Sequence, residues 1–233
     1  MVPILDLKKL KFMKKLFIIL IILSGLSVFG QGFGVEMGLT PGKFIASVEE
    51  TVAGMDVSHK WRTGFTLKID YDLPVTDFIY VSPGLSYIQK GSVLETSYME
   101  NGDQWHNVYK FSTGYLQFPV LLKFHFPLNR DFTVGLQGGG FYATALGGRL
   151  YYEYFRNGQS VEKDFRSLQF GTDTNDDFIR SDVGIIAGAT VYYQSFSFTL
   201  EYQRGVTNIL TDYDVYFTSL IAIRLGYRFY RRY

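Results

Sequence analysis

The chain has 233 residues, no cysteine and a formal net charge of +1. Residues 1–30 contain five Lys and one Asp, so the remaining chain has 18 basic and 21 acidic side chains and a net charge of −3, which argues against a nucleic-acid partner. Without cysteine we expect no disulfide framework, thiol chemistry or lipoprotein anchor. The aromatic content of 18% and the 24 glycines favour a membrane β-barrel over a soluble globule.

The N-terminal segment has the layout of an export signal. Lys14 and Lys15 precede an unbroken apolar run over 16–23, after which the residues become smaller. This order is typical of a secretory signal peptide, and the run is short for a transmembrane anchor, which is the alternative. We therefore predict a signal peptide over residues 1–30, with Met13 as an alternative start.

Apolar residues recur at every second position in eight stretches of the remaining chain, 31–233. These stretches are 32–40, 61–72, 78–90, 114–126, 132–145, 179–193, 195–203 and 217–230. The pattern is clearest in 114–126, where Leu, Phe and Val alternate with Gln117, Lys123 and His125. A strand between lipid and a polar lumen has this pattern. We predict one domain with an all-β fold, an eight-stranded antiparallel up-and-down transmembrane β-barrel.

The connections between these stretches alternate between long and short. The four long polar connections are 41–60, 91–112, 146–178 and 204–216. Outer-membrane barrels place short turns in the periplasm and long loops outside, so we expect these four to be extracellular loops of a Gram-negative outer-membrane protein. Its partners would then be outer-membrane lipid, lipopolysaccharide and the barrel-assembly machinery. A soluble β-sandwich is the alternative, but its outward face would be polar.

Four segments carry a family resemblance that extends over most of residues 32–230. They are 82–91 (SPGLSYIQKG), 115–124 (YLQFPVLLKF), 182–188 (DVGIIAG) and 200–209 (LEYQRGVTNI). The motif positions within them are Gly84, Tyr115, Leu116, Pro119, Lys123, Tyr202, Gly205 and Asn208. Together they resemble the PorT-like family of outer-membrane β-barrel proteins. The resemblance implies the barrel fold and, because the namesake assists protein secretion and gliding systems of Bacteroidetes-type bacteria, an accessory role in such a complex.

Pro119 stands inside a predicted strand, where proline removes one donor from the hydrogen-bond ladder. We expect a bulge or local bend in the barrel wall at this position. A gate in the wall is the alternative interpretation.

Charged side chains fall on the predicted inner face of several strands. They are Glu36, Arg62, Lys68, Asp70, Lys123, Glu201, Arg224 and Arg228. A charge in a narrow interior needs a partner or water, and side chains just fill an eight-stranded barrel. We predict a salt-bridged plug that holds the barrel rigid, with a small ion path as the alternative. The pairing of acids with bases stays open.

The polar residues give no diagnostic catalytic or metal-binding pattern. His59, His106 and His125 lie apart in sequence, and their acidic and serine neighbours have no spacing typical of a hydrolase or a metal site. The glycines at 135–140 lie within a strand with no helix after them, which excludes a phosphate loop. We predict no catalytic, cofactor-binding or metal-binding residues, with an outer-rim hydrolase or acyltransferase as a minor alternative.

The leading functional prediction is a non-enzymatic envelope component, either structural or an accessory of a protein secretion or gliding system. The alternative is a binding barrel whose extracellular loops capture a small hydrophobic or protein ligand. The acidic residues Asp173, Asp176 and Asp177 suggest either solvated loop surface or a site for divalent cations that bridge to lipopolysaccharide or contact a protein partner.

Overall fold

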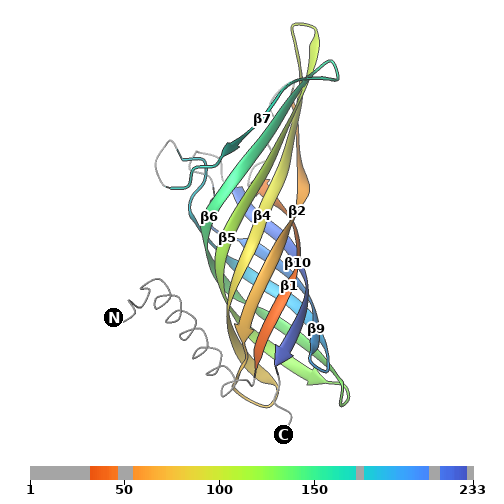
Figure 1. Cartoon of the computed structure of the whole chain (residues 1–233), viewed down its shortest axis with the longest axis vertical. Coiled ribbons are helices and arrows are strands. Elements are labelled where there is room, and N and C mark those ends of the chain that lie inside the picture. The colour runs from red at the N-terminus through yellow and green to blue at the C-terminus, as the bar shows by residue number, and fades with distance from the viewer. Residues whose placement is uncertain (1–31, 47–54, 172–175, 210–215, 230–233) are drawn as a thin grey trace, which may run out of the picture.

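The computed structural model describes residues 32–46, 55–171, 176–209 and 216–229, so the predicted signal peptide and its cleavage site lie outside the described residues. The described chain forms strands joined mostly by short turns (Figure 1). The strands are β1 (Phe33–Ala46), β2 (Met55–Tyr71), β3 (Leu73–Pro74), β4 (Ile79–Glu100), β5 (Asp103–Pro127), β6 (Phe132–Arg156), β7 (Gln159–Ser167), β8 (Ser181–Tyr193), β9 (Phe196–Gly205) and β10 (Tyr216–Phe229).

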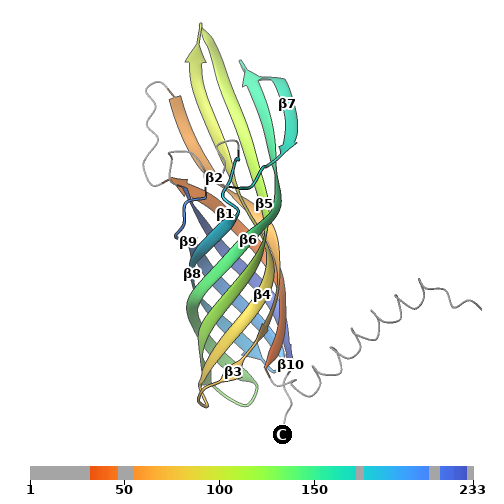
Figure 2. The same ribbon diagram turned by 90° about the vertical axis from the view of Figure 1, so that its left-hand side faces the viewer.

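Eight of these strands close into a ring. Their order is β2-β1-β10-β9-β8-β6-β5-β4, every neighbouring pair is antiparallel, and β4 pairs with β2 to complete the circle. The short β3 adds to the lower edge of β4, and β7 pairs with β6 outside the ring (Figure 2). The predicted eight-stranded antiparallel barrel is confirmed.

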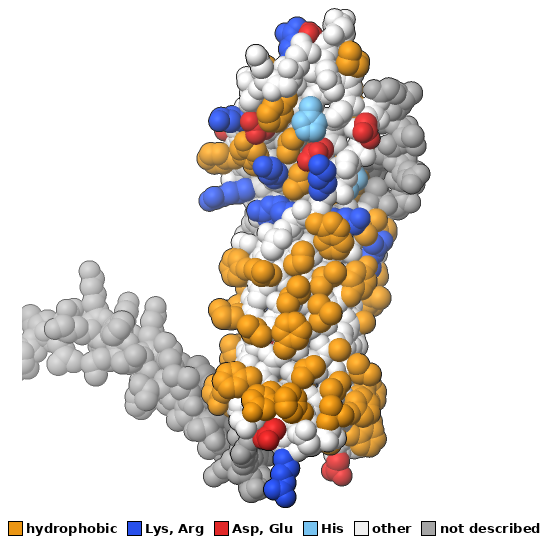
Figure 3. All heavy atoms as spheres, turned by 90° about the vertical axis from the view of Figure 1, so that its right-hand side faces the viewer, with side chains coloured by type: hydrophobic (Ala, Val, Ile, Leu, Met, Phe, Trp, Pro, Cys, Tyr) orange, Lys and Arg blue, Asp and Glu red, His pale blue; other side chains and the backbone are white. Residues whose placement is uncertain are grey.

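The alternation of side chains also follows the prediction. On β5 the outward Phe118 and Val120 are 45% and 55% exposed, whereas the inward Gln117 is 1% exposed. Successive residues of a pleated strand point to opposite faces, so one face meets lipid and the other the lumen. On the face shown in Figure 3, apolar side chains form a broad band over the lower barrel, with Lys and Arg side chains directly above it. Among the described residues, no helix is long and apolar enough to cross a membrane.

The long connections differ most from the prediction. Residues 91–112 are not a loop, because β4 and β5 continue through them and pair up to Glu100 and Asp103. Residues 146–167 likewise form a second hairpin from β6 and β7, and β1 and β2 extend well into 41–60. The result is a twisted sheet that stands above the barrel (Figure 2).

Two Asn-Gly turns explain these hairpins. Asn101 and Gly102 have φ values of 52° and 86°, and Asn157 and Gly158 have φ values of 50° and 80°. Positive φ at both central residues is the requirement of a two-residue type I′ turn, for which Asn-Gly is the preferred sequence. The two Asn-Gly pairs are visible in the sequence, and they favour paired strands at these positions even though the flanking residues are polar.

Of the bulge or local bend expected at Pro119, the bulge is wrong and the local bend stays a prediction. The register of β4 with β5 is the same on both sides of it, from Pro83 opposite Val120 to Ser86 opposite Gln117. The ring of Pro119 fits because Gly84 lacks a Cβ, which would lie 3.2 Å from the proline Cγ. The irregularity of β5–β6 pairing lies instead between Gly114 and Tyr115.

Candidate functional site in the barrel lumen

Eight charged side chains, four acidic and four basic, form one connected set of ion pairs in the half of the lumen nearer the short turns. We call this set the lumen network. Its members are Glu36, Lys68, Asp70, Asp72, Lys123, Glu201, Arg224 and Arg228. Each of them is at most 3% exposed. Equal numbers of acids and bases leave no net formal charge in this interior, which is what burial of so many charges requires.

The lower part of the lumen network is a four-membered cluster. The Lys123 ammonium lies 2.7 Å from Asp70 Oδ2 and 3.0 Å from Asp72 Oδ1. Arg228 donates from Nη2 to Asp70 Oδ1 at 2.9 Å and also pairs with Asp72. Within this cluster each carboxylate therefore faces both cations, and each cation faces both carboxylates.

The upper part of the lumen network joins four consecutive strands of the ring, β2, β1, β10 and β9. Arg224 on β10 donates from Nε to Glu36 Oε2 on β1 at 2.8 Å and also contacts Glu201 on β9. Lys68 on β2 lies 3.4 Å from both Glu201 Oε1 and Asp70 Oδ2, which connects the upper and lower parts. These contacts cross-link strands β1, β2, β5, β9 and β10 through the lumen.

The lumen above the lumen network contains apolar layers, which the sequence interpretation of a polar interior did not anticipate. A buried apolar cluster comes from the inward faces of β4, β5, β6, β8 and β10. Its members are Ile88, Tyr115, Leu121, Phe141, Ala143, Ala145, Ile186, Leu220 and Ala222. Along β10, Ala222 and Leu220 separate Arg224 from Thr218, so the apolar layer follows the charged one.

A separate buried ion pair lies beyond this layer. Lys90 Nζ is 2.6 Å from Asp182 Oδ2, and Thr218 Oγ1 donates to the same carboxylate oxygen at 2.8 Å. The Lys90 ammonium also lies 4.4 Å from the centroid of the Phe141 ring, a cation–π contact. A second apolar cluster then fills the extracellular mouth; its members are Phe44, Leu150, Leu168, Phe178, Ile209 and Tyr216.

The structure brings seven of the eight predicted lumen charges together. The exception is Arg62, which is half-buried and makes no ion pair with any carboxylate in the described ranges. The pairing of β2 with β4 shifts register between Trp61 and Thr66, the segment that contains Arg62, and the Arg62 side chain lies beside Gly91 instead of a carboxylate.

Three buried charges escaped the sequence analysis: Asp72, Lys90 and Asp182. Strand parity could have found them, since each shares the inner face of its strand with residues already assigned there. Asp72 and Lys90 were the last residues of the predicted stretches 61–72 and 78–90, and the strand of Lys90 in fact continues to Glu100.

The remaining motif positions have structural contacts. Tyr115 is buried in the lumen, and Leu116 and Tyr202 lie on the lipid-facing side. Gly205 makes room for the Asp182 carboxylate, because a Cβ there would lie 2.7 Å from Asp182 Oδ1. Asn208 Oδ1 accepts a hydrogen bond from the Tyr216 backbone N–H at 2.9 Å.

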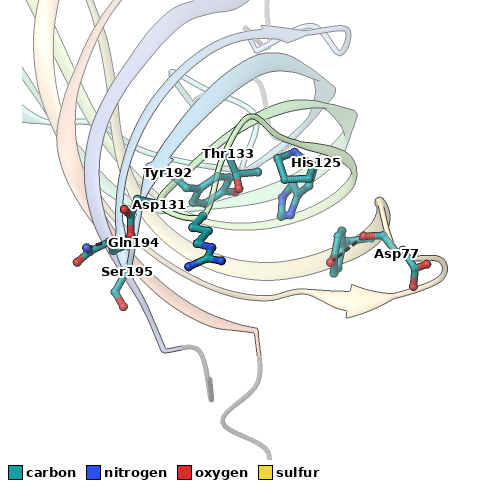
Figure 4. Close-up of a pocket in the computed structure, with 10 residues that line it drawn as sticks. Asp77, His125, Asp131, Thr133, Tyr192, Gln194 and Ser195 are labelled. Carbon is teal, nitrogen blue, oxygen red and sulfur yellow. Dashed lines mark hydrogen bonds between the residues drawn. The ribbon is translucent and has the colours of Figure 1, made fainter. Parts of the chain in front are cut away.

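The lumen opens on the periplasmic side into a vestibule of about 690 Å³ (Figure 4). His125 lies between Tyr80 and Tyr192 on its wall, with ring centroids 4.5 and 5.0 Å away. Arg130 and Asp131 from the short turn after β5 contribute the charged part of the lining. The lumen network lies directly beyond His125, because Lys123 is the next inward residue on β5.

One histidine has a serine and a carboxylate beside it. On the outer face of the protruding sheet, His106 Nδ1 lies 3.0 Å from Ser97 Oγ, and its Nε2 lies 4.0 Å from Glu95 Oε2. The same Glu95 oxygen accepts a hydrogen bond from Lys60 Nζ at 2.6 Å. No group of three or more His, Cys, Asp or Glu side chains in the described ranges could hold a metal ion.

A closed antiparallel ring with apolar side chains outside and ion pairs inside defines a transmembrane β-barrel. The chain belongs to the family described as outer membrane protein beta-barrel domain, whose profile matches residues 29–211. It is therefore a protein of the outer membrane of a Gram-negative bacterium.

Among solved structures, the chain is similar to Ail, the attachment invasion locus protein of Yersinia pestis, with 13% identity and a TM-score of 0.40 over 85% of this chain and 99% of that one. It is similar to OprG from Pseudomonas aeruginosa, with 12% identity and a TM-score of 0.43 over 87% and 99%. It is also similar to Neisserial surface protein A, with 10% identity and a TM-score of 0.36 over 85% and 98%. No curated protein gives a significant match.

Proposed function

We propose that this protein is a non-enzymatic, non-conducting outer-membrane barrel that presents a rigid extracellular sheet to a protein partner. Its role would be that of an accessory of a secretion or gliding system, as the PorT-like motif segments imply. The N-terminal signal would export the chain. The barrel-assembly machinery would then recognise the aromatic end of β10 and insert the barrel into the outer membrane. The observation that carries it is the continuation of β4, β5 and β6 beyond the apolar band as one paired sheet with β7.

Two features support a partner-binding role for this sheet. The tips of its hairpins are tied together, because Asp103 accepts hydrogen bonds from Arg156 Nε at 2.8 Å and from Asn157 Nδ2 at 2.6 Å. The outer strand β7 pairs only with β6 among the described strands, which leaves its other edge available for strand addition. A sheet held in one shape loses little conformational entropy when a partner binds.

The layered lumen supports the non-conducting part of the proposal. Alternating layers of ion pairs and apolar side chains would leave no continuous polar path for an ion. Steady stepwise currents from the refolded protein in planar bilayers would overturn this part. Near-background conductance at 0.1 M and 1 M salt is the expected result.

The absence of cysteine allows the partner-binding role to be tested by site-specific crosslinking. Val161 on β7 is 54% exposed, and Val75 in the short turn after β3 is 61% exposed. A photocrosslinker attached to Val161→Cys should trap a defined extracellular partner in native outer membranes, while the same reagent on Val75→Cys should not trap that partner. Recovery of the uncrosslinked monomer from both variants would contradict the proposal.

The arrangement of Ser97, His106 and Glu95 supports a second candidate, a hydrolase at the outer face. Against it, Glu95 is paired with Lys60, and the sheet around Ser97 uses its backbone N–H groups in strand pairing, which leaves none to stabilise an oxyanion. A fluorophosphonate probe should leave the protein unlabelled. Labelling that disappears in both Ser97→Ala and His106→Gln would establish the enzyme instead.

A further inference from the structure

The outward face of the protruding sheet carries two basic side chains just above the apolar band. Lys110 on β5 and Arg149 on β6 are both exposed. Ser112 lies opposite Arg149, and Lys110 lies opposite Tyr151, so the two basic residues are diagonal neighbours on one face. Such neighbours have Cα atoms about 7–8 Å apart, a spacing that lets both side chains reach one phosphate group.

Neither side chain is neutralised. In the described part of the chain, no carboxylate forms a salt bridge with Lys110 or Arg149, whereas Lys60 on the same face is paired with Glu95 at 2.6 Å. The nearest carboxylate on this face, Glu153, accepts hydrogen bonds from Tyr151 and Ser160, both at 2.9 Å. Those two hydrogen bonds are the main causes that lower the pKa of Glu153, and the charges of Lys163 and Lys110 lower it further, so Lys110 acts on this carboxylate at a distance without forming an ion pair with it.

The surface directly below these cations is apolar. Leu146, Phe118 and Tyr142 are 60%, 45% and 49% exposed on the lipid-facing side. Ser112 lies four residues beyond Leu116 on β5, which is a rise of about 10 Å for a strand tilted near 40°. This height matches the headgroup region, and long basic side chains can bend toward it.

Hydroxyl groups complete the surface. Arg149 lies between Ser112 on β5 and Ser167 on β7 in the same row of the sheet. The Lys110 ammonium is held 5.2 Å from the centroid of the Tyr151 ring, which limits its freedom without removing its charge. Two cations flanked by hydroxyls, above an apolar wall, match a phosphorylated headgroup whose acyl chains extend downward.

We propose that Lys110, Arg149, Ser112 and Ser167 form a binding site for the phosphorylated headgroup of an outer-leaflet glycolipid. The acyl chains of the lipid pack on Leu146, Phe118 and Tyr142. The site does not use the edge of β7 that faces away from β6, because Ser167 and the other members of the site project from the outward face of the sheet.

The test uses the refolded full-length barrel in detergent with EDTA, so that divalent cations cannot bridge carboxylates to the lipid. The probes are purified lipopolysaccharide, the same lipopolysaccharide after enzymatic dephosphorylation, and inorganic phosphate. The dissociation constant of each is measured for the wild type, Lys110→Gln/Arg149→Gln, and the control Arg130→Gln. Arg130 is an exposed cation at the periplasmic end, so the control removes charge where no outer-leaflet lipid lies.

The double variant should bind intact lipopolysaccharide at least about tenfold more weakly, as expected for the loss of two charge-assisted contacts. The wild type should bind dephosphorylated lipopolysaccharide at least about tenfold more weakly than intact lipopolysaccharide. Arg130→Gln should bind intact lipopolysaccharide as tightly as the wild type does. Heat-modifiable migration verifies that each variant is folded. The proposal is overturned if the folded double variant keeps wild-type affinity, if dephosphorylation has no effect, or if Arg130→Gln weakens binding equally. Inorganic phosphate bound as tightly as the lipid would overturn the lipid assignment.

Discussion

Arg224 and Glu36 are 188 residues apart in the chain, yet Arg224 Nε donates to Glu36 Oε2 at 2.8 Å across the seam between the last and the first strand. Their strands pair directly, with Glu36 opposite Gly226 and Gly38 opposite Arg224. Glycines at both facing positions leave room for the two long side chains to meet. The ion pair therefore stabilises the one strand pairing that joins the two ends of the barrel.

Removal of one partner of this pair should be costly. Arg224→Met leaves Glu36 and Glu201 buried without their strongest cation, and such a loss lowers the free energy of unfolding by about 3–5 kcal/mol. The measurement is urea unfolding in lipid vesicles, followed by the heat-modifiable band on gels. Lys60→Met, which breaks an ion pair with a Lys side chain 56% exposed, is the control and should cost less than about 1 kcal/mol. Equal losses of unfolding free energy in the two variants would show that the buried ion pair stabilises the barrel no more than the exposed one.

Gly34 should tolerate no side chain. A Cβ at this position would lie 2.6 Å from Asp70 Oδ1 and 2.9 Å from Arg228 Nη2, so Gly34→Ala has to displace that ion pair. We expect a loss of about 1–3 kcal/mol in the free energy of unfolding. Gly138→Ala is the matched control within the barrel wall, because its Cβ would meet only the Ile186 carbonyl oxygen at 3.7 Å. If Gly34→Ala leaves the free energy of unfolding unchanged, the lumen network can rearrange without cost.

The first protruding hairpin should depend on its Asn-Gly turn. Gly102→Ala places a Cβ at a φ of 86°, which costs about 1–2 kcal/mol locally. Hydrogen exchange of the amides flanking the turn should accelerate, while heat-modifiable migration of the barrel stays unchanged. Asn101→Gly is the control, since glycine suits that position of a type I′ turn. If exchange is the same in both variants, another contact holds the hairpin.

The contact between the two hairpin tips should weaken in acid. Hydrogen bonds from Arg156 and Asn157 lower the pKa of Asp103 below its usual value. A carboxyl whose folded pKa is depressed contributes stability above the unfolded pKa of about 3.9 and loses it as pH falls through the lower folded value. Hydrogen exchange near Asn157 should thus rise only below about pH 4. In Asp103→Asn this pH dependence should vanish; its persistence would assign the effect to another group.

The alternation of inward and outward residues along each strand was sufficient to predict the ring. Lipid outside and a lumen inside impose a strict period of two on every spanning strand. Residues such as Phe118 and Gln117 therefore reveal their faces without knowledge of their neighbours. The lumen partners of each charge could not be predicted in this way. Lys68 meets Glu201 only because of the register across the four strands β2, β1, β10 and β9, and the alternation of faces alone does not specify register.

The extracellular sheet was missed for a different reason. Residues 91–112 were interpreted as a loop on account of their polarity, although Asn101-Gly102 is a strong hairpin signal. A strand that leaves the membrane no longer has a lipid face, so its apolar alternation fades while its backbone pairing continues. The apolar layers of the lumen were hidden similarly, since Leu121 and Ile186 lie on the inner face among charged and polar neighbours.

The seam at Arg224 and Glu36 also constrains the biogenesis of the protein. Glu36 and Asp70 reach the periplasm long before the strand that supplies Arg224 and Arg228. A half-built sheet would have to enter hydrocarbon with carboxylates that lack these counter-ions, at a cost of several kcal/mol each. Lys68 and Lys123 offset part of the charge of Glu36, Asp70 and Asp72, and the remaining counter-ions, Arg224 and Arg228, come only with the last strand. Insertion strand by strand is thus penalised relative to insertion of a sheet that already contains the last strand.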